Sequence, residues 1–400
     1  MRIWNCRFVS LIAAASGLPL AAGAQNSAPA APSKPVMSNF APDIKPEALW
    51  DGRKMVPFKT LDDPKMVKAA EADYLTDSEY VLGMERNGES RAYPTRFIWW
   101  HHGINDNIGV EGKGGKSPVA ITYCSVCNTG VGYDRILDGK ELKIDFLGLY
   151  NGIVALCERE SSSAFLQADG RFVTNTYSGK SLKMLPLLDT TWGEWKKLHP
   201  DTLVMSPQEP YLKYYSPKEK PELRGYDRFP APFFKPSVTR GDKRLPPFDK
   251  VLGVFMAGPK GADGELAAIR RAYPIKTLTE AGGIVNDQIG DEPVAVLLQP
   301  GSVTASALSR KLDGKTLTFE SRKLSDGSLA YFDKETGSRW SIEGKAEEGP
   351  SAGKSLGRIE NHLSQWYGWV AYFPQTTIYG RTDAPQPSTF DEAAAAHSKP

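Results

Sequence analysis

The sequence predicts an α+β protein that is predominantly β, built as two tandem pseudo-symmetric repeats of a meandering sheet with short helices. Three observations lead to this prediction. The 400 residues include 37 Gly and 30 Pro, which favour turns and short strands over long helices. Segments such as VAIT and ELKIDF are β-branched or alternate in polarity, as strands do. The same short words also recur in the same order in two parts of the chain.

The first 24 residues are expected to form a secretory signal peptide. Arg2 and Arg7 precede an apolar run, and Ala22-Gly23-Ala24 supplies an Ala-x-Ala cleavage site. The run is shorter than the roughly 18 apolar residues that span a bilayer. We therefore expect a periplasmic or secreted protein, cleaved near Ala24, without a transmembrane segment. Residues 25–40 are rich in Ala, Pro and Ser and are predicted to be a disordered leader, followed by an N-terminal extension over 41–79.

The two repeats are expected over residues 80–206 and 250–380. VLG, RAYP and GKSL each occur once in both, and PVAITYCSVCNTGVGYDRILDGK from Pro118 aligns without a gap on PVAVLLQPGSVTASALSRKLDGK from Pro293. Trp192, Trp195 and Pro200 match Trp366, Trp369 and Pro374. A Pro- and Lys-rich connection, residues 207–249, joins the repeats, and residues 381–400 are predicted to be a disordered tail.

Local signals place elements within each repeat. Asp138-Gly139 at the centre of Leu137–Lys140 predicts a hairpin turn. The segment TTWGEWKKLHPD predicts a short helix that Thr191 caps, with Glu194 three residues later, and that Pro200 ends. The recurring tryptophans are expected to anchor this helix in the core.

Charge does not point to a nucleic-acid partner. The chain carries 49 Lys and Arg against 47 Asp and Glu, a formal +2 that falls to about zero when the signal peptide leaves. There is no nucleotide-binding signal either. A periplasmic protein or a small molecule remains open as a partner.

Cysteine is rare and unevenly placed. Loss of Cys6 with the signal peptide leaves Cys124, Cys127 and Cys157, an odd number for an oxidising compartment. Where the first repeat has His101, Cys124 and Cys127, the second has Gly282, Gln299 and Ser302. Reactive side chains are thus present in one copy of a shared frame, and we place the candidate site there.

Several chemistries fit a Cys-x-x-Cys pair. A disulfide that encloses only two intervening residues constrains little of the unfolded chain. It would therefore add little to the stability of the fold. Thioredoxin-like chemistry needs a helix after the first cysteine, whereas NTGVGYDRILDGK runs into a hairpin. Covalent haem needs a histidine directly after the second cysteine, where Asn128 stands. Cys124, Cys127 and His101 would form a soft metal site for copper or zinc, with His102 and Cys157 as weaker candidate ligands.

The remaining candidates have competing structural interpretations. Cys157 aligns with Phe332 and is expected in the core. Asn105-Asp106 is expected to form a turn, and Asp106 is a catalytic candidate because of its closeness in sequence to His101. Asp134 closes the cysteine strand and is, with Cys124 and Cys127, a further catalytic candidate; either aspartate could orient the imidazole.

Several motifs of the chain resemble those of a bacterial family, domain of unknown function 3179. They are Trp100-His101 with Asn105-Asp106, Pro118–Thr129, Asp134-Arg135, Gly179–Leu182 and Thr190–Ser206. The resemblance covers about Tyr80 to Gly380. His102 stands where the family often has Glu. The resemblance supports the fold class and the place of the site and implies no substrate.

Two classes of function follow. The first is an exported protein in which a site formed by His101, Cys124 and Cys127 binds copper or zinc. The bound metal could serve oxidoreductase chemistry. The alternatives are a non-catalytic binding or assembly module with a local Cys124–Cys127 disulfide, and a dithiol oxidoreductase.

Overall fold

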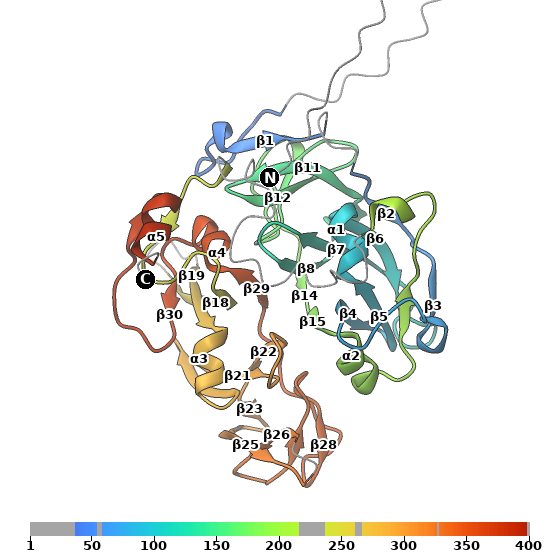
Figure 1. Ribbon diagram of the computed structural model, residues 1–400, viewed down its shortest axis with the longest axis vertical. Coiled ribbons are helices and arrows are strands. Elements are labelled where there is room, and N and C mark those ends of the chain that lie inside the picture. The colour runs from blue at the N-terminus through green and yellow to red at the C-terminus, as the bar shows by residue number, and fades with distance from the viewer. Residues whose placement is uncertain (1–36, 54–57, 216–236, 261–265, 326–327, 398–400) are drawn as a thin grey trace, which may run out of the picture. The chain divides into compact units, whose positions relative to one another are not determined.

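Strands dominate the computed structural model of the chain, with 43% of residues in strands and 14% in helices. The predicted α+β, predominantly β class is confirmed. The structure describes residues 37–53, 58–215, 237–260, 266–325 and 328–397 (Figure 1). The predicted signal peptide, nearly all of the leader and residues 216–236 of the connection lie outside the described residues.

The first half of the chain forms three main sheets and one small hairpin. One sheet has the order β15 (Leu188–Thr191), β4 (Tyr80–Arg86), β5 (Glu89–Pro94), β16 (Leu203–Met205), β3 (Met66–Lys68). The second has the order β14 (Met184–Leu185), β8 (Thr129–Asp134), β7 (Ser117–Cys124), β6 (Gly103–Ile108), β2 (Leu61–Asp62). The third has the order β1 (Leu49–Asp51), β11 (Ile144–Tyr150), β12 (Ile153–Glu158), β13 (Ala164–Leu166). The hairpin pairs β9 (Ile136–Leu137) with β10 (Lys140–Glu141).

The sheets of the second half have a strand order similar to those of the first half, with fewer edge strands. One sheet has the order β29 (Asn361–Gln365), β18 (Lys250–Lys260), β19 (Leu266–Pro274), β30 (Thr377–Ile378). The others are β20 (Ile284–Ile289), β21 (Glu292–Leu298), β22 (Ala305–Ser309), and β25 (Phe319–Lys323), β26 (Leu329–Asp333), β27 (Arg339–Trp340), β28 (Ala346–Glu348). Two small pairs are β23 (Lys311–Leu312) with β24 (Lys315–Thr316), and β17 (Gly241–Asp242) with β31 (Pro387–Ser388).

Helices are short throughout the described residues. The α-helices are α1 (Thr95–His101), α2 (Trp192–Leu198), α3 (Ile275–Glu280), α4 (Trp366–Tyr372) and α5 (Phe390–Ala396). Among the described residues, 3-10 turns cover Pro46–Ala48, Ala69–Glu71, Asn175–Tyr177 and Leu212–Tyr214. None of the described helices is long and apolar enough to cross a membrane.

The recurring tryptophans anchor α2 and α4, as expected. Trp195 lies over Gly83 of β4, where an added Cβ would come within 2.3 Å of the indole ring. Its indole N–H donates to the Thr202 hydroxyl at 2.8 Å. The same arrangement recurs for Trp369, Gly253 and Thr376, with an indole hydrogen bond of 2.9 Å and an added Cβ at 1.9 Å from the ring. The glycine of the repeated word VLG therefore makes room for the tryptophan.

An ion pair also recurs in both halves, buried in the first and half-buried in the second. Asp106 of β6 accepts hydrogen bonds from the Arg91 guanidinium at 2.6 Å and the Tyr93 hydroxyl at 2.6 Å. The corresponding contacts join Asp287 to Arg271 at 2.6 Å and to Tyr273 at 2.7 Å. The repeated word RAYP supplies the donors in each half. These shared contacts support the predicted duplication, which itself stays an inference.

Each half places its tryptophan helix against a turn of the other half. The Gln365 N–H at the start of α4 donates to the Cys127 carbonyl at 3.0 Å. In the opposite direction, the Gln299 amide donates to Glu194 of α2 at 3.0 Å. The hydrophobic clusters mix residues of both halves accordingly, and residues from Val36 to Pro400 form one compact unit.

The predicted disordered tail differs from the structure over residues 381–397. Pro387–Ser388 pairs with Gly241–Asp242, and α5 follows. Thr389 caps α5 by accepting from the Glu392 N–H, and Glu392 bonds back to the Thr389 N–H. Phe390 is buried against Phe248 and Tyr367. A capping box and an aromatic anchor thus fix a segment whose Ala and Pro content suggested disorder.

Candidate functional site

The two cysteines lie on the turn that joins β7 to β8. Cys124 is the last residue of β7 and pairs in register with Thr129, the first residue of β8. Asn128 adopts a left-handed conformation with φ of 54°, which Asn tolerates better than most residues. This tight turn places the two thiols next to each other, so that each shifts the pKa of the other. Both side chains are completely buried.

A backbone donor from a neighbouring sheet reaches the Cys124 sulfur. The Val154 N–H of β12 points at it from 3.4 Å. The nearby N–H groups of Val126 and Cys127 also favour the ionised form and help to lower the pKa of Cys124. The Cys127 sulfur instead lies 3.2 Å from the Thr129 hydroxyl. The two sulfurs therefore have different environments, although they are neighbours.

These environments shift the pKa values of the two thiols in opposite directions. Burial by itself raises the pKa of Cys124, but the hydrogen bonds from the Cys127 thiol and the backbone N–H groups outweigh it and lower that pKa. Burial and the neighbouring Cys124 raise the pKa of Cys127 well above its ordinary value. The pair therefore loses its first proton at Cys124, and Cys127 keeps its own.

Helix α4 of the second half covers the turn. Gly368 packs so closely that an added Cβ would lie 3.0 Å from Cβ of Cys127. Tyr367 is fully buried, and burial together with the nearby cysteines raises its pKa well above the ordinary value. Sequence reasoning missed this cover. The available signal was that Gly368 aligns with Glu194, a small residue in place of a large one.

His101, the third predicted ligand, has other partners. It is the last residue of α1, and its Nδ1 lies 2.6 Å from the Lys59 carbonyl, to which it donates. Its Nε2 lies 3.1 Å from the Tyr215 hydroxyl. Burial, only partly offset by the Lys59 hydrogen bond, lowers the pKa of His101 to about 4. The ring is therefore neutral at pH 7, with both nitrogens engaged away from the sulfurs.

His102, the weaker histidine candidate, is held next to the cysteine strand. It ends α1 in a left-handed conformation, and its Nδ1 donates to the Tyr123 carbonyl at 3.0 Å. Its ring packs against Phe58 and Phe146 at centroid distances of 4.5 and 5.1 Å. Burial lowers the pKa of His102 to about 4 as well.

The structure thus brings Cys124 and Cys127 together and does not add His101 to them. Within the described ranges, no group of three or more His, Cys, Asp or Glu side chains is arranged to hold a metal ion. The predicted copper or zinc site stays a prediction, with the two thiols as its available ligands.

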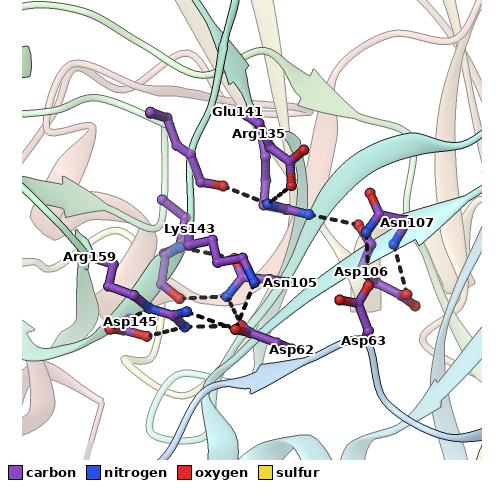
Figure 2. A network of polar contacts seen from close by, with 12 residues as sticks. Asp62, Asp63, Asn105, Asp106, Asn107, Arg135, Glu141, Lys143, Asp145 and Arg159 are labelled. Atoms are coloured by element: carbon purple, nitrogen blue, oxygen red, sulfur yellow. Dashed lines mark hydrogen bonds and ion pairs between the residues drawn. The ribbon is translucent and has the colours of Figure 1, made fainter.

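Asp106 and Asp134 form ion pairs with arginines in the strands next to the cysteine turn. Asn105 and Asp106 lie inside strand β6, so the expected turn is wrong; the buried Arg91 partner outweighs the local turn preference. Figure 2 shows the surrounding polar network, in which Arg135 donates to the main chain of Asp106 and Asn105 reaches Asp62. Asp134 ends β8 and pairs with Arg86 at 3.0 Å.

Cys157 lies apart from the pair. It is in β12, 2% exposed, in a cluster with Leu147, Ala164 and Val173. The expected core position is confirmed. Its role as a weaker metal ligand stays a prediction.

The fold and site define a predominantly β protein with a buried, asymmetric dithiol on a hairpin turn. Over residues 57–376 the chain matches the family described as "Protein of unknown function (DUF3179)". The chain therefore belongs to the DUF3179 family. Comparison with curated proteins found no match, and comparison with solved structures found none either.

Proposed function

We propose that this protein is a dithiol redox protein in which Cys124 and Cys127 alternate between two thiols and an intramolecular disulfide. The observation that carries the proposal is the buried pair of neighbouring thiols, in which the Val154 N–H donates to the Cys124 sulfur and the Thr129 hydroxyl contacts the Cys127 sulfur. A low-pKa thiol beside a high-pKa thiol is the division of roles that thiol–disulfide exchange requires.

The exchange can be written with named atoms. The Cys124 thiolate attacks one sulfur of a small disulfide, and the other half leaves as a thiolate. Cys127 then loses its proton to that thiolate, attacks the Cys124 sulfur and releases the second half. Two electrons pass from the cysteine pair to the oxidant, which ends as two thiols. Because both sulfurs are fully buried, the reactant must be small or α4 must move aside.

The test is a redox titration of the chain exported into the periplasm, in graded reduced and oxidised glutathione. Samples are quenched with acid, alkylated and analysed as peptides. We expect a loss of two hydrogens confined to the peptide with Cys124 and Cys127, and a midpoint within the range of exchange-active pairs, about −120 to −270 mV. The peptide with Cys157 is the internal control and should stay a thiol. A bridge that no glutathione ratio reduces would favour the non-catalytic module.

A soft metal ion is the second candidate. Two neighbouring sulfurs in a buried, aromatic-lined cluster are ligands that copper and zinc accept. Elemental analysis of the same exported protein separates the candidates. One copper or zinc per chain, lost in Cys124→Ser and Cys127→Ser, together with thiols that do not titrate, would replace the redox proposal with the metal site. Export itself, and the cleavage near Ala24, are part of the proposal; N-terminal sequencing of the exported protein tests them.

A further inference from the structure

A second polar cluster lies on the opposite side of β5 from the Arg91–Asp106 pair. The Ser90 hydroxyl of β5 is 3.0 Å from Nδ1 of His199, the residue that ends α2. Nε2 of the same ring is 2.9 Å from a Glu343 carboxylate oxygen. The Nε2 atom has no hydrogen-bond partner of normal geometry, so its contact with Glu343 is close without being a directed hydrogen bond. Ser90 and His199 come from the first half and Glu343 from the second.

The charged neighbours of Glu343 favour its ionised form, and this determines which nitrogen of His199 carries the proton. Burial raises the pKa of Glu343, but His199 and the charges of Arg358 and Lys345 outweigh it and lower that pKa. An ionised Glu343 keeps the proton of His199 on Nε2. Nδ1 then carries a lone pair, and the Ser90 hydroxyl donates to it. This is the arrangement in which an imidazole can take the proton of a serine nucleophile.

The cluster opens onto a pocket with a volume of about 650 Å³ that Ser90 and His199 line. His199 is held against Trp195 at a ring-centroid distance of 4.0 Å, so the base is rigid. The charged lining residues are Glu89, Glu111, Asp201 and Lys116. The excess of carboxylates disfavours an anionic ligand and accepts a neutral or cationic one.

The cluster is not part of the repeated frame. In the sequence alignment of the halves, Ser90 corresponds to Arg270 and His199 to Phe373. At that place the Arg270 guanidinium lies 5.6 Å from the Phe373 ring centroid. The helix, the tryptophan and the strands occur in both halves. At the corresponding place near α4, Asp169 aligns with Glu343 and interacts electrostatically with Arg270, so a charged pair stands there in place of the serine–histidine contact.

We propose that Ser90, His199 and Glu343 form an acyl-transfer site for neutral or cationic carboxylic esters. The Ser90 oxygen bonds to the ester carbonyl carbon while its proton passes to Nδ1 of His199. The alcohol leaves with that proton, and an acyl-serine remains. Water, deprotonated by Nδ1, then releases the acid and restores Ser90. Glu343 orients the imidazole and stabilises its charge.

The test uses the full exported chain and a fluorophosphonate probe, which phosphonylates an activated serine and releases fluoride. Peptide mass spectrometry of the native protein should place the label on Ser90, and Ser90→Ala should remove it. His199→Gln should slow labelling by about 10²- to 10⁴-fold, the usual contribution of a general base. Turnover of 4-nitrophenyl acetate should fall by a similar factor in His199→Gln.

Ser388→Ala is the matched control, because Ser388 lies on β31 outside the pocket lining; it should label like the native chain. Native protein that takes up no label, or takes it up on another residue, overturns the proposal. The native mapping needs no variant, so a variant that fails to fold does not remove the test. Glu343→Gln should slow labelling less than His199→Gln, and equal labelling of all three proteins would show that the contact only joins the two halves.

Discussion

The Val154 N–H points at the Cys124 sulfur from 3.4 Å, which joins the cysteine turn to a strand of a different sheet. A backbone donor cannot be removed by side-chain substitution. The backbone part of the stabilisation of the Cys124 thiolate is therefore a property of the fold. It persists in Cys127→Ser, where the serine hydroxyl can donate in place of the Cys127 thiol.

The two cysteines should react at different pH values. In Cys127→Ser the remaining Cys124 thiol should react with methyl methanethiosulfonate along a pH profile centred below that of an ordinary cysteine, about 8.5. In Cys124→Ser the remaining Cys127 thiol should show a profile centred above it, because burial raises its pKa. Mass spectrometry of timed samples measures both. Coincident profiles would contradict the asymmetry.

Gly368→Ala should destabilise the protein through the cysteine turn. Its new methyl group would lie 3.0 Å from Cβ of Cys127 and 3.1 Å from the Ser364 hydroxyl. Such overpacking costs about 1–3 kcal/mol. Gly357→Ala is the control, since its nearest neighbour would be Ser309 at an ordinary 3.6 Å. Urea unfolding measures both; equal midpoints would show that α4 does not press on the turn.

Local signals in the sequence were sufficient for the elements that depend on a few adjacent residues. Thr191 accepts from the Glu194 N–H at 3.3 Å and begins α2, as its spacing predicted. Asp138 and Gly139 have positive φ values of 52° and 76°, as the hairpin turn required. Trp195 and Trp369 are buried anchors because their glycine partners recur with them.

The contacts of the candidate site depend on tertiary packing, which no local sequence pattern predicts. His101 was expected beside the cysteines, but its ring is fixed by Lys59 and Tyr215, which belong to segments outside the aligned repeats. The cover by α4 arises from the contact between halves, and no local pattern predicts which turn a helix will meet. Asp106 had a turn signal, and a buried cation decided its conformation instead.

Asp106→Asn should separate a structural from a catalytic role for this carboxylate. Arg91 and Asp106 are 8% and 3% exposed, so the substitution leaves a buried guanidinium without its main counter-ion, at a cost of about 3–5 kcal/mol. Asp287→Asn removes the same contact where Arg271 is 24% exposed and should cost less. Chemical unfolding gives both values. The Cys124 alkylation rate of the folded protein should stay unchanged, and a large fall in that rate would restore Asp106 as a participant.

Acid should destabilise the fold through its buried histidines. His101, His102 and His362 have pKa values lowered to about 4, mainly by burial, whereas an unfolded histidine has a pKa of about 6.5. Between these values the unfolded chain binds more protons than the folded chain, so stability is lost as the pH falls from about 6.5 towards 4. Each of the three should contribute a loss of about 2 kcal/mol between pH 7.5 and pH 5.

His102→Asn isolates one of these contributions. Asparagine tolerates the left-handed backbone at this position, where φ is 57°, and does not titrate. The variant should be less stable than the native chain at pH 7.5, because it loses the packing against Phe58 and Phe146. Its urea midpoint should nevertheless fall less steeply towards pH 5. Parallel pH dependences of the two proteins would mean that His102 is protonated in the folded state, and that its hydrogen bond to Tyr123 does not hold the ring neutral.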